Sequence, residues 1–145
     1  MKPYELWNSN ADRETAILLK RWLENRNAGL NFADYLLECG YNQVTIWDAG
    51  EIGRLLYHEL HGTQVQVNMF IDRNAEGIHT INGIPVYPLS QIKQIPAESV
   101  SLVSTIFNFN EIQRLLLDTD PRLRSIYLKD AVYEMDYKEE NYDHQ

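Results

Sequence analysis

The residues with the clearest chemical meaning form one short turn between a predicted strand and a predicted helix. The run Val44–Gly53 reads VTIWDAGEIG, with glycines at the third and sixth places of the dinucleotide-binding pattern. Glycine there lets a pyrophosphate approach the backbone and lets the helix pack close to the sheet. Backbone N–H groups at a helix start attract anions. The spacing predicts a nucleotide phosphate site formed by Asp48, Ala49, Gly50, Glu51, Ile52 and Gly53.

The first place of this pattern holds Asp48, where glycine is usual. A carboxylate about 4 Å from a phosphate repels it by ~1–4 kcal/mol, for effective dielectric constants of about 80 to 20. A second interpretation is therefore open, in which Gly50 and Gly53 serve only the turn and the helix–sheet contact. The conformation of residues 47–53 decides between them, because an Asp48 carboxylate inside the anion cradle would disfavour a dinucleotide.

Two further pairs of residues extend the predicted site. Asp72 closes the next strand about twenty residues after the glycines, where a carboxylate can accept hydrogen bonds from a ribose diol. Arg73 follows it and can meet a phosphate, whereas Asp72 has the alternative role of capping the 73–77 loop. Ser104 and Thr105 close the strand expected across the switch point and can hydrogen-bond a ligand.

Other reactive side chains do not form a catalytic or metal-binding constellation, so we predict neither. His58 and His61 lie three apart on a helix without a third ligand and are expected to be solvated. Cys39 lies on an apolar helical stripe and is expected to be a buried structural thiol.

We expect the three tryptophans to lie in the core or at an interface; they are Trp7, Trp22 and Trp47. Asn108 can hydrogen-bond a ligand but is expected to cap a helix. Lys129 and Asp130 follow the last strand, and for them a ligand contact and a structural role both stay open.

The segments around the turn alternate between strand-like and helix-like patterns. Runs rich in β-branched and aromatic residues predict strands, and apolar residues at i, i+3, i+4 and i+7 predict helices. The expected strands are 43–48, 65–72, 84–87 as an edge strand, 100–106 and 125–128. Within 77–87, Asn82-Gly83 predicts a turn between two short extended pieces. The expected helices are 11–26, 32–39, 51–61, 88–95, one after Asn108, and a final turn at 129–135. The residues expected on inward helix faces include Ala16, Leu19, Leu23, Leu55 and Leu115.

This alternation predicts a Rossmann-like α/β fold, three-layered, with a mostly parallel sheet of about five strands and an N-terminal pair of helices. The first strand is expected at the centre, beside a switch point where ligands of open α/β sheets bind. The expected divisions are a helical extension over 1–41, the Rossmann-like domain over 42–136, and a frayed acidic tail over 137–145.

The amino-acid composition argues against some classes of binding partner and indicates a cellular compartment. A net charge of −8 argues against a general nucleic-acid binder, which needs clustered Lys and Arg. No apolar run predicts a membrane span, and the N-terminal residues lack the pattern of a secretory signal. With a single cysteine and no export signal, we expect a cytoplasmic protein.

The run from Gln43 to Leu89 resembles a Rossmann-like domain of bacterial surface-polysaccharide enzymes. The matching pieces are WDAGEIGRLLYHEL, VNMFIDRN and INGIPVYPL, of which the last is not part of the general dinucleotide pattern. It is similar to the N-terminal domain of nucleotide-sugar dehydratases and epimerases, and of sugar acyltransferases. The resemblance implies that Gly50, Gly53 and Asp72 bind a nucleotide, either NAD(P) or that of a UDP-sugar. Catalysis in those relatives belongs to a separate domain.

Two hypotheses follow. The first is a nucleotide-binding module of nucleotide-sugar or surface-polysaccharide metabolism, without complete catalytic machinery, whose partner is a small-molecule nucleotide. The second is a degenerate domain that binds no ligand and acts in interaction or oligomerisation, as a homo-oligomer or with a polysaccharide-biosynthesis partner. The second expects Trp22 or Tyr35 at an interface. A stand-alone oxidoreductase is a weaker third possibility, since no acid–base site is evident, and enzymatic activity is left open.

Overall fold

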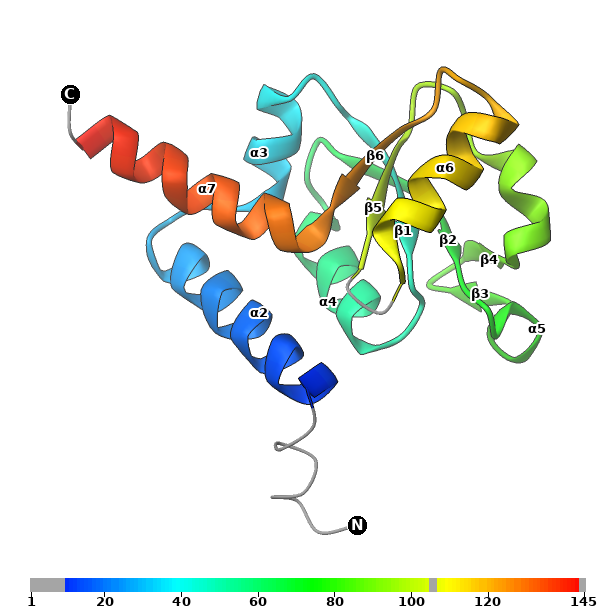
Figure 1. Ribbon diagram of the computed structural model, residues 1–145, viewed down its shortest axis with the longest axis horizontal. Coiled ribbons are helices and arrows are strands. Elements are labelled where there is room, and N and C mark those ends of the chain that lie inside the picture. Colours follow the sequence, from blue (N-terminus) through cyan, green and yellow to red (C-terminus); the bar gives the residue numbers. More distant parts are fainter. Residues whose placement is uncertain (1–9, 105–106, 144–145) are drawn as a thin grey trace, which may run out of the picture. The chain divides into compact units, whose positions relative to one another are not determined.

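The computed structural model describes residues 10–104 and 107–143 of the 145-residue chain. It divides into two compact units (Figure 1). One is Phe32–Leu128, and the other joins the residues up to Asn31 with those from Lys129 onward. The division differs from the expected boundaries after residues 41 and 136. The helix over Phe32–Glu38 belongs with the sheet, and the residues from Lys129 onward belong with the N-terminal helix.

The larger unit is built on a six-stranded sheet in the order β3-β4-β2-β1-β5-β6. All neighbouring strands pair in parallel except β3 and β4. The strands are β1 (Gln43–Trp47), β2 (Gln66–Ile71), β3 (Thr80–Ile81), β4 (Ile84–Tyr87), β5 (Val100–Val103) and β6 (Arg124–Tyr127). The predicted Rossmann-like α/β class and the central place of the first strand are thus confirmed, with one strand more than expected.

The additional strand comes from a tight hairpin. Asn82 and Gly83 have φ values of 50° and 81°, and a two-residue hairpin turn needs positive φ at both central positions. The turn pairs β3 with β4 in antiparallel fashion. The prediction that 84–87 forms the sheet edge is therefore wrong, because β4 lies between β2 and β3 and the two-residue β3 takes the edge.

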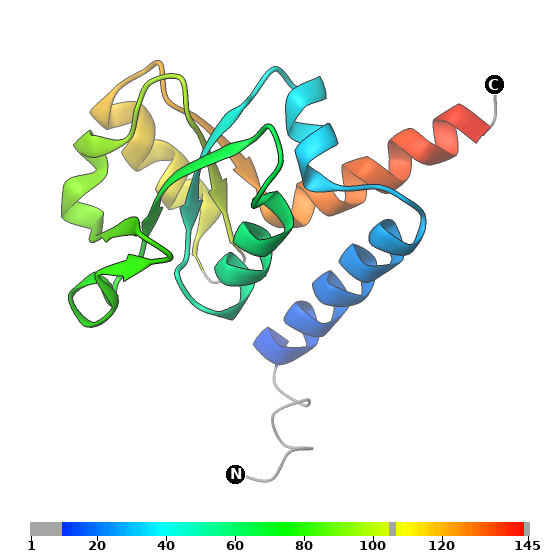
Figure 2. The same cartoon turned by 180° about the vertical axis from the view of Figure 1, so that it is seen from behind.

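Helices cover both faces of the sheet (Figures 1 and 2). The helices α3 (Phe32–Glu38) and α4 (Glu51–Leu60) lie on one face, and η1 (Leu89–Gln94) and α6 (Phe109–Thr119) lie on the other, while α5 (Ala75–Ile78) is a single turn. On the α6 face the buried cluster is Trp47, Met69, Ile71, Ile92, Ile95, Val103, Phe107, Ile112, Leu116 and Leu123. Trp47 meets Phe107 edge-to-face, with ring centroids 5.7 Å apart. These contacts place the carboxyl ends of β1 and β5 against the start of α6.

Two leucines expected on inward helix faces are turned outward. Leu55 of α4 is 47% exposed and Leu115 of α6 is 37% exposed. In α4 the buried face instead includes Tyr57, whose ring meets Phe70 of β2 at 6.0 Å between centroids. Helix α6 begins as predicted, because the Asn108 side chain accepts a hydrogen bond from the Glu111 amide at 3.2 Å.

Helix α3 ends at Glu38, shortly before Gly40, and glycine is the residue typical of the position that follows a helix. Gly40 has φ 92°, and the Tyr41 amide donates to the Leu36 carbonyl at 2.8 Å, as in a Schellman motif. Cys39 precedes this turn and is exposed, so the prediction of a buried thiol is wrong. The apolar stripe stops one turn earlier, at the fully buried Leu36.

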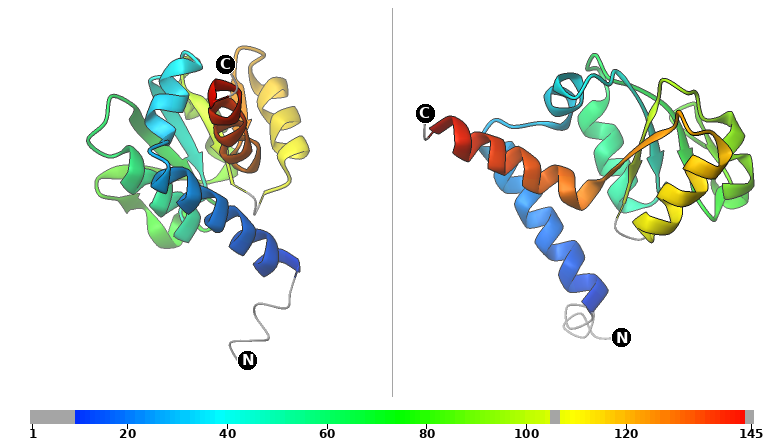
Figure 3. Two further views of the ribbon diagram at one scale, coloured as in Figure 1. Left: turned by 90° about the vertical axis from the view of Figure 1, so that its left-hand side faces the viewer. Right: turned by 45° about the horizontal axis from the view of Figure 1, so that its top comes forward.

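The second unit contains α2 (Asn10–Asn27) and, from its second residue onward, α7 (Leu128–Asp143), and Figure 3 shows both as uninterrupted coils. The buried Asn25 side chain donates to the Val132 carbonyl at 2.8 Å and joins the two helices. Helix α7 extends beyond the single turn expected at 129–135, into residues expected to fray. In α2 the buried residues are Leu18, Trp22 and Asn25, whereas Leu23 of the expected inward stripe is 62% exposed.

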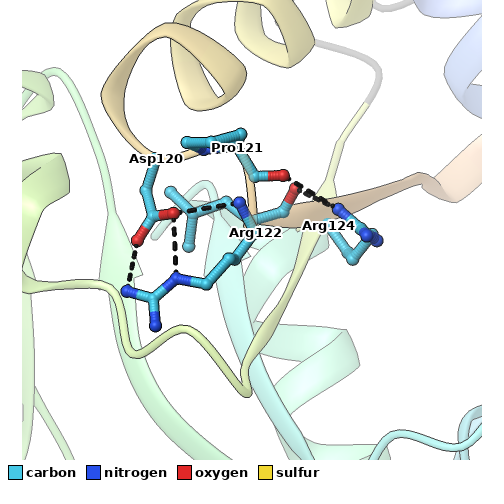
Figure 4. A network of polar contacts seen from close by, with 5 residues as sticks. Asp120, Pro121, Arg122 and Arg124 are labelled. Carbon is cyan, nitrogen blue, oxygen red and sulfur yellow. Dashed lines mark hydrogen bonds and ion pairs between the residues drawn. The ribbon is translucent and has the colours of Figure 1, made fainter.

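A polar network closes the connection from α6 to β6 (Figure 4). The Asp120 carboxylate accepts from the Arg122 backbone amide at 2.9 Å, and from its guanidinium at 3.1 Å and 2.8 Å. The neighbouring Arg124 guanidinium donates to the Pro121 carbonyl at 3.1 Å. Hydrogen bonds from Arg122 hold the pKa of Asp120 below its usual value. Because the Arg122 side chain is 75% exposed, we expect this ion pair to shape the turn more than to stabilise the fold.

Candidate ligand site at the carboxyl edge of the sheet

The predicted turn lies at the point where ligands of this architecture bind. Strand β1 ends at Trp47, and α4 begins at Glu51 with Gly50 as its N-cap. The neighbours of β1 end beside the same turn, since the Asp48 amide donates to the Ile71 carbonyl at 2.8 Å and the Ser104 amide donates to the Trp47 carbonyl at 3.4 Å. The structure thus brings together the carboxyl ends of β1, β2 and β5, at a topological switch point.

Asp48 occupies the anion cradle of this turn with its own side chain. One carboxylate oxygen accepts a hydrogen bond from the Gly50 amide, and the other accepts from the Gly53 amide at 3.2 Å. Asp48 is only 2% exposed and has φ 132°, a backbone conformation that favours glycine. The two amides that a bound phosphate would need are therefore already paired with a carboxylate.

The same carboxylate and its backbone account for both glycines. A Cβ atom on Gly53 would lie 1.8 Å from the carbonyl oxygen of Asp48 and 3.3 Å from a methyl group of Ile46. The predicted close contact of this glycine with the sheet is thus confirmed. A Cβ atom on Gly50 would lie 2.9 Å from the Asp48 carboxylate. Each glycine is explained by internal packing, without reference to a ligand.

Asp72 fastens the turn to the end of β2. One of its oxygens accepts from the Ala49 amide at 2.7 Å, and the other accepts from the Asn74 amide at 2.7 Å. The predicted capping of the following loop is thus present, and Asp72 also bridges two strand ends. The Arg54 guanidinium holds the turn from its other side by donating to the Ala49 carbonyl at 2.9 Å. The role of Asp72 toward a ribose stays a prediction.

The electrostatics of the turn disfavour a second negative charge. Burial raises the pKa of Asp48 above its usual value, and the nearby Asp72 carboxylate raises it further. The hydrogen bonds from the Gly50 and Gly53 amides act in the opposite direction and lower this pKa. Burial is the largest of these effects, so the turn destabilises the charged form of Asp48 relative to a free carboxylate, and a phosphate would bring further negative charge to the same place.

The remaining predicted site residues lie at different depths around the turn. Glu51 is exposed and Ile52 is buried, and their amides open α4, where no intrahelical acceptor is available. Ser104 is 3% exposed, and Thr105 lies outside the described residues. Arg73 is exposed, and its guanidinium lies 5.0 Å from the centroid of the Phe107 ring. The sequence interpretation missed Phe107 and Arg54, which neither the glycine pattern nor the strand ends single out.

The other reactive side chains lie apart from this edge. His58 and His61 are exposed as predicted, and the hydroxyl of Tyr57 lies 3.2 Å from a ring nitrogen of His61. Across residues 10–104 and 107–143, no three His, Cys, Asp or Glu side chains are grouped so that they could hold a metal ion. Trp22 and Trp47 are buried as expected, while Trp7 is outside the described part.

Fold and turn together define an α/β domain of the Rossmann-like class whose glycine turn holds a carboxylate, that of Asp48, on the amides of Gly50 and Gly53. The chain matches no known protein-family model and no curated protein sequence. The resemblance to nucleotide-sugar enzymes therefore stays a prediction. Within the part of the chain that the structure covers, none of the helices has the length and apolar character needed to cross a bilayer.

Proposed function

We propose that this chain is a Rossmann-like domain that binds no dinucleotide at its glycine turn and acts through protein–protein contacts. The observation that carries the proposal is the pairing of the Asp48 carboxylate with the Gly50 and Gly53 amides. A carboxylate in this place supplies the charge and the acceptors that a bound phosphate would otherwise supply. It leaves the fold intact while removing the usual ligand.

A phosphate could enter only if Asp48 left the cradle or took up a proton. Displacement would break hydrogen bonds between amides and an ionised group, which contribute about 1.5–3 kcal/mol each. A phosphate beside the ionised carboxylate would meet a repulsion of ~1–4 kcal/mol at about 4 Å. These are the costs of two alternative routes, displacement of Asp48 or entry beside it, and each of them exceeds the attraction of one helix N-terminus, about 0.3–1 kcal/mol.

The surface of the helical unit supports a role in protein contacts. Ile17 and Leu23 of α2 are 53% and 62% exposed, and Tyr133 of α7 is 38% exposed. The rings expected at an interface, Trp22 and Tyr35, are instead buried at 7% and 5% exposure. A partner surface would thus use the exposed side chains of α2 rather than these two rings.

Nucleotide binding remains the second candidate, for NAD(P) or a UDP-sugar as the resemblance implies. Its support is the position of Asp72 and Arg73 at the end of β2 and the glycines at 50 and 53. It requires a rearranged turn, with Asp48 outside the cradle. In that case the link to nucleotide-sugar or surface-polysaccharide metabolism would also become the leading proposal.

Calorimetry with NAD(H), NADP(H), UDP-sugars and CoA separates the two candidates. We expect no binding to the wild-type chain up to millimolar concentrations. Asp48→Gly frees both amides and suits the positive φ, so this variant should gain affinity for NAD and for inorganic pyrophosphate. Asp48→Asn is the matched control, because it keeps the side-chain volume and removes the charge. Micromolar binding of any of these nucleotides to the wild type would overturn the proposal.

A further inference from the structure

We draw no further inference here: the strongest candidate, the apolar groove between α2 and α7 that Ile17, Leu18 and Tyr133 line, carries none, because nothing in the described part of the chain shows what covers it.

Discussion

Asp72 accepts a 2.7 Å hydrogen bond from the backbone amide of Ala49, so the end of β2 is joined directly to the turn that follows β1. The carboxylate expected to receive a ribose thus performs a structural task in this chain. Together with Asp48 it satisfies the amides of Ala49, Gly50 and Gly53. The turn is held closed by two carboxylates of the protein.

Removal of the Asp72 carboxylate should loosen this turn. Asp72→Ala leaves the amides of Ala49 and Asn74 without their acceptor, and we expect a loss of about 1–3 kcal/mol in the free energy of unfolding. Urea denaturation followed by tryptophan fluorescence measures it. Asp118→Ala, on the exposed side of α6, should change the free energy by less than about 0.5 kcal/mol. Equal effects of the two variants would show that Asp72 does not hold the turn.

A side chain at position 53 should be more damaging than one at Gly62. In Gly53→Ala the new Cβ would overlap the Asp48 carbonyl at 1.8 Å, which only a backbone shift can relieve. We expect a loss of about 2–3 kcal/mol in the free energy of unfolding. Gly62→Ala is the control, because its Cβ would meet open space and only its φ of 79° is unfavourable, at about 1–2 kcal/mol. If Gly62→Ala proved the more damaging of the two, the close helix–sheet contact would be refuted.

The raised pKa of Asp48 predicts a pH dependence of stability with a definite sign. A folded-state pKa above the unfolded value of 3.8 means that the folded chain binds the proton more tightly. Its stabilising contribution is complete below pH 3.8 and is lost as the pH rises through the folded-state pKa. Relative to Asp48→Asn, the free energy of unfolding of the wild type should therefore fall across this pH window. Above the window, the difference in free energy of unfolding between the two proteins should be constant. Denaturation curves of both proteins at a series of pH values check this, and a difference that grows in favour of the wild type as the pH rises would contradict it.

Local patterns predicted most of the secondary structure correctly. The β-branched run at 43–48, the Asn82–Gly83 turn and the Asn108 cap all act over a few residues, so they are legible without the rest of the chain. The errors concern which face of a helix is buried. Leu23 and Leu55 fit an apolar helical period, but this period does not say which of two neighbouring faces packs against the rest of the protein. In both helices the buried face is the one that does not carry these leucines.

For the candidate site too, the local conformation was predictable from the sequence, whereas the contacts between distant residues were not. The order of residues alone determined that a strand, a glycine-containing turn and a helix follow one another, since sterics and hydrogen bonding within a few residues select those conformations. Whether the amides of that turn are free was decided only by the tertiary structure. The Asp48 side chain can point into the cradle or away from it, and the choice depends on the strands and the helix that bury it and on Asp72 across from it. Distant segments of the chain meet only after folding, so the state of the cradle depends on contacts that no local pattern contains.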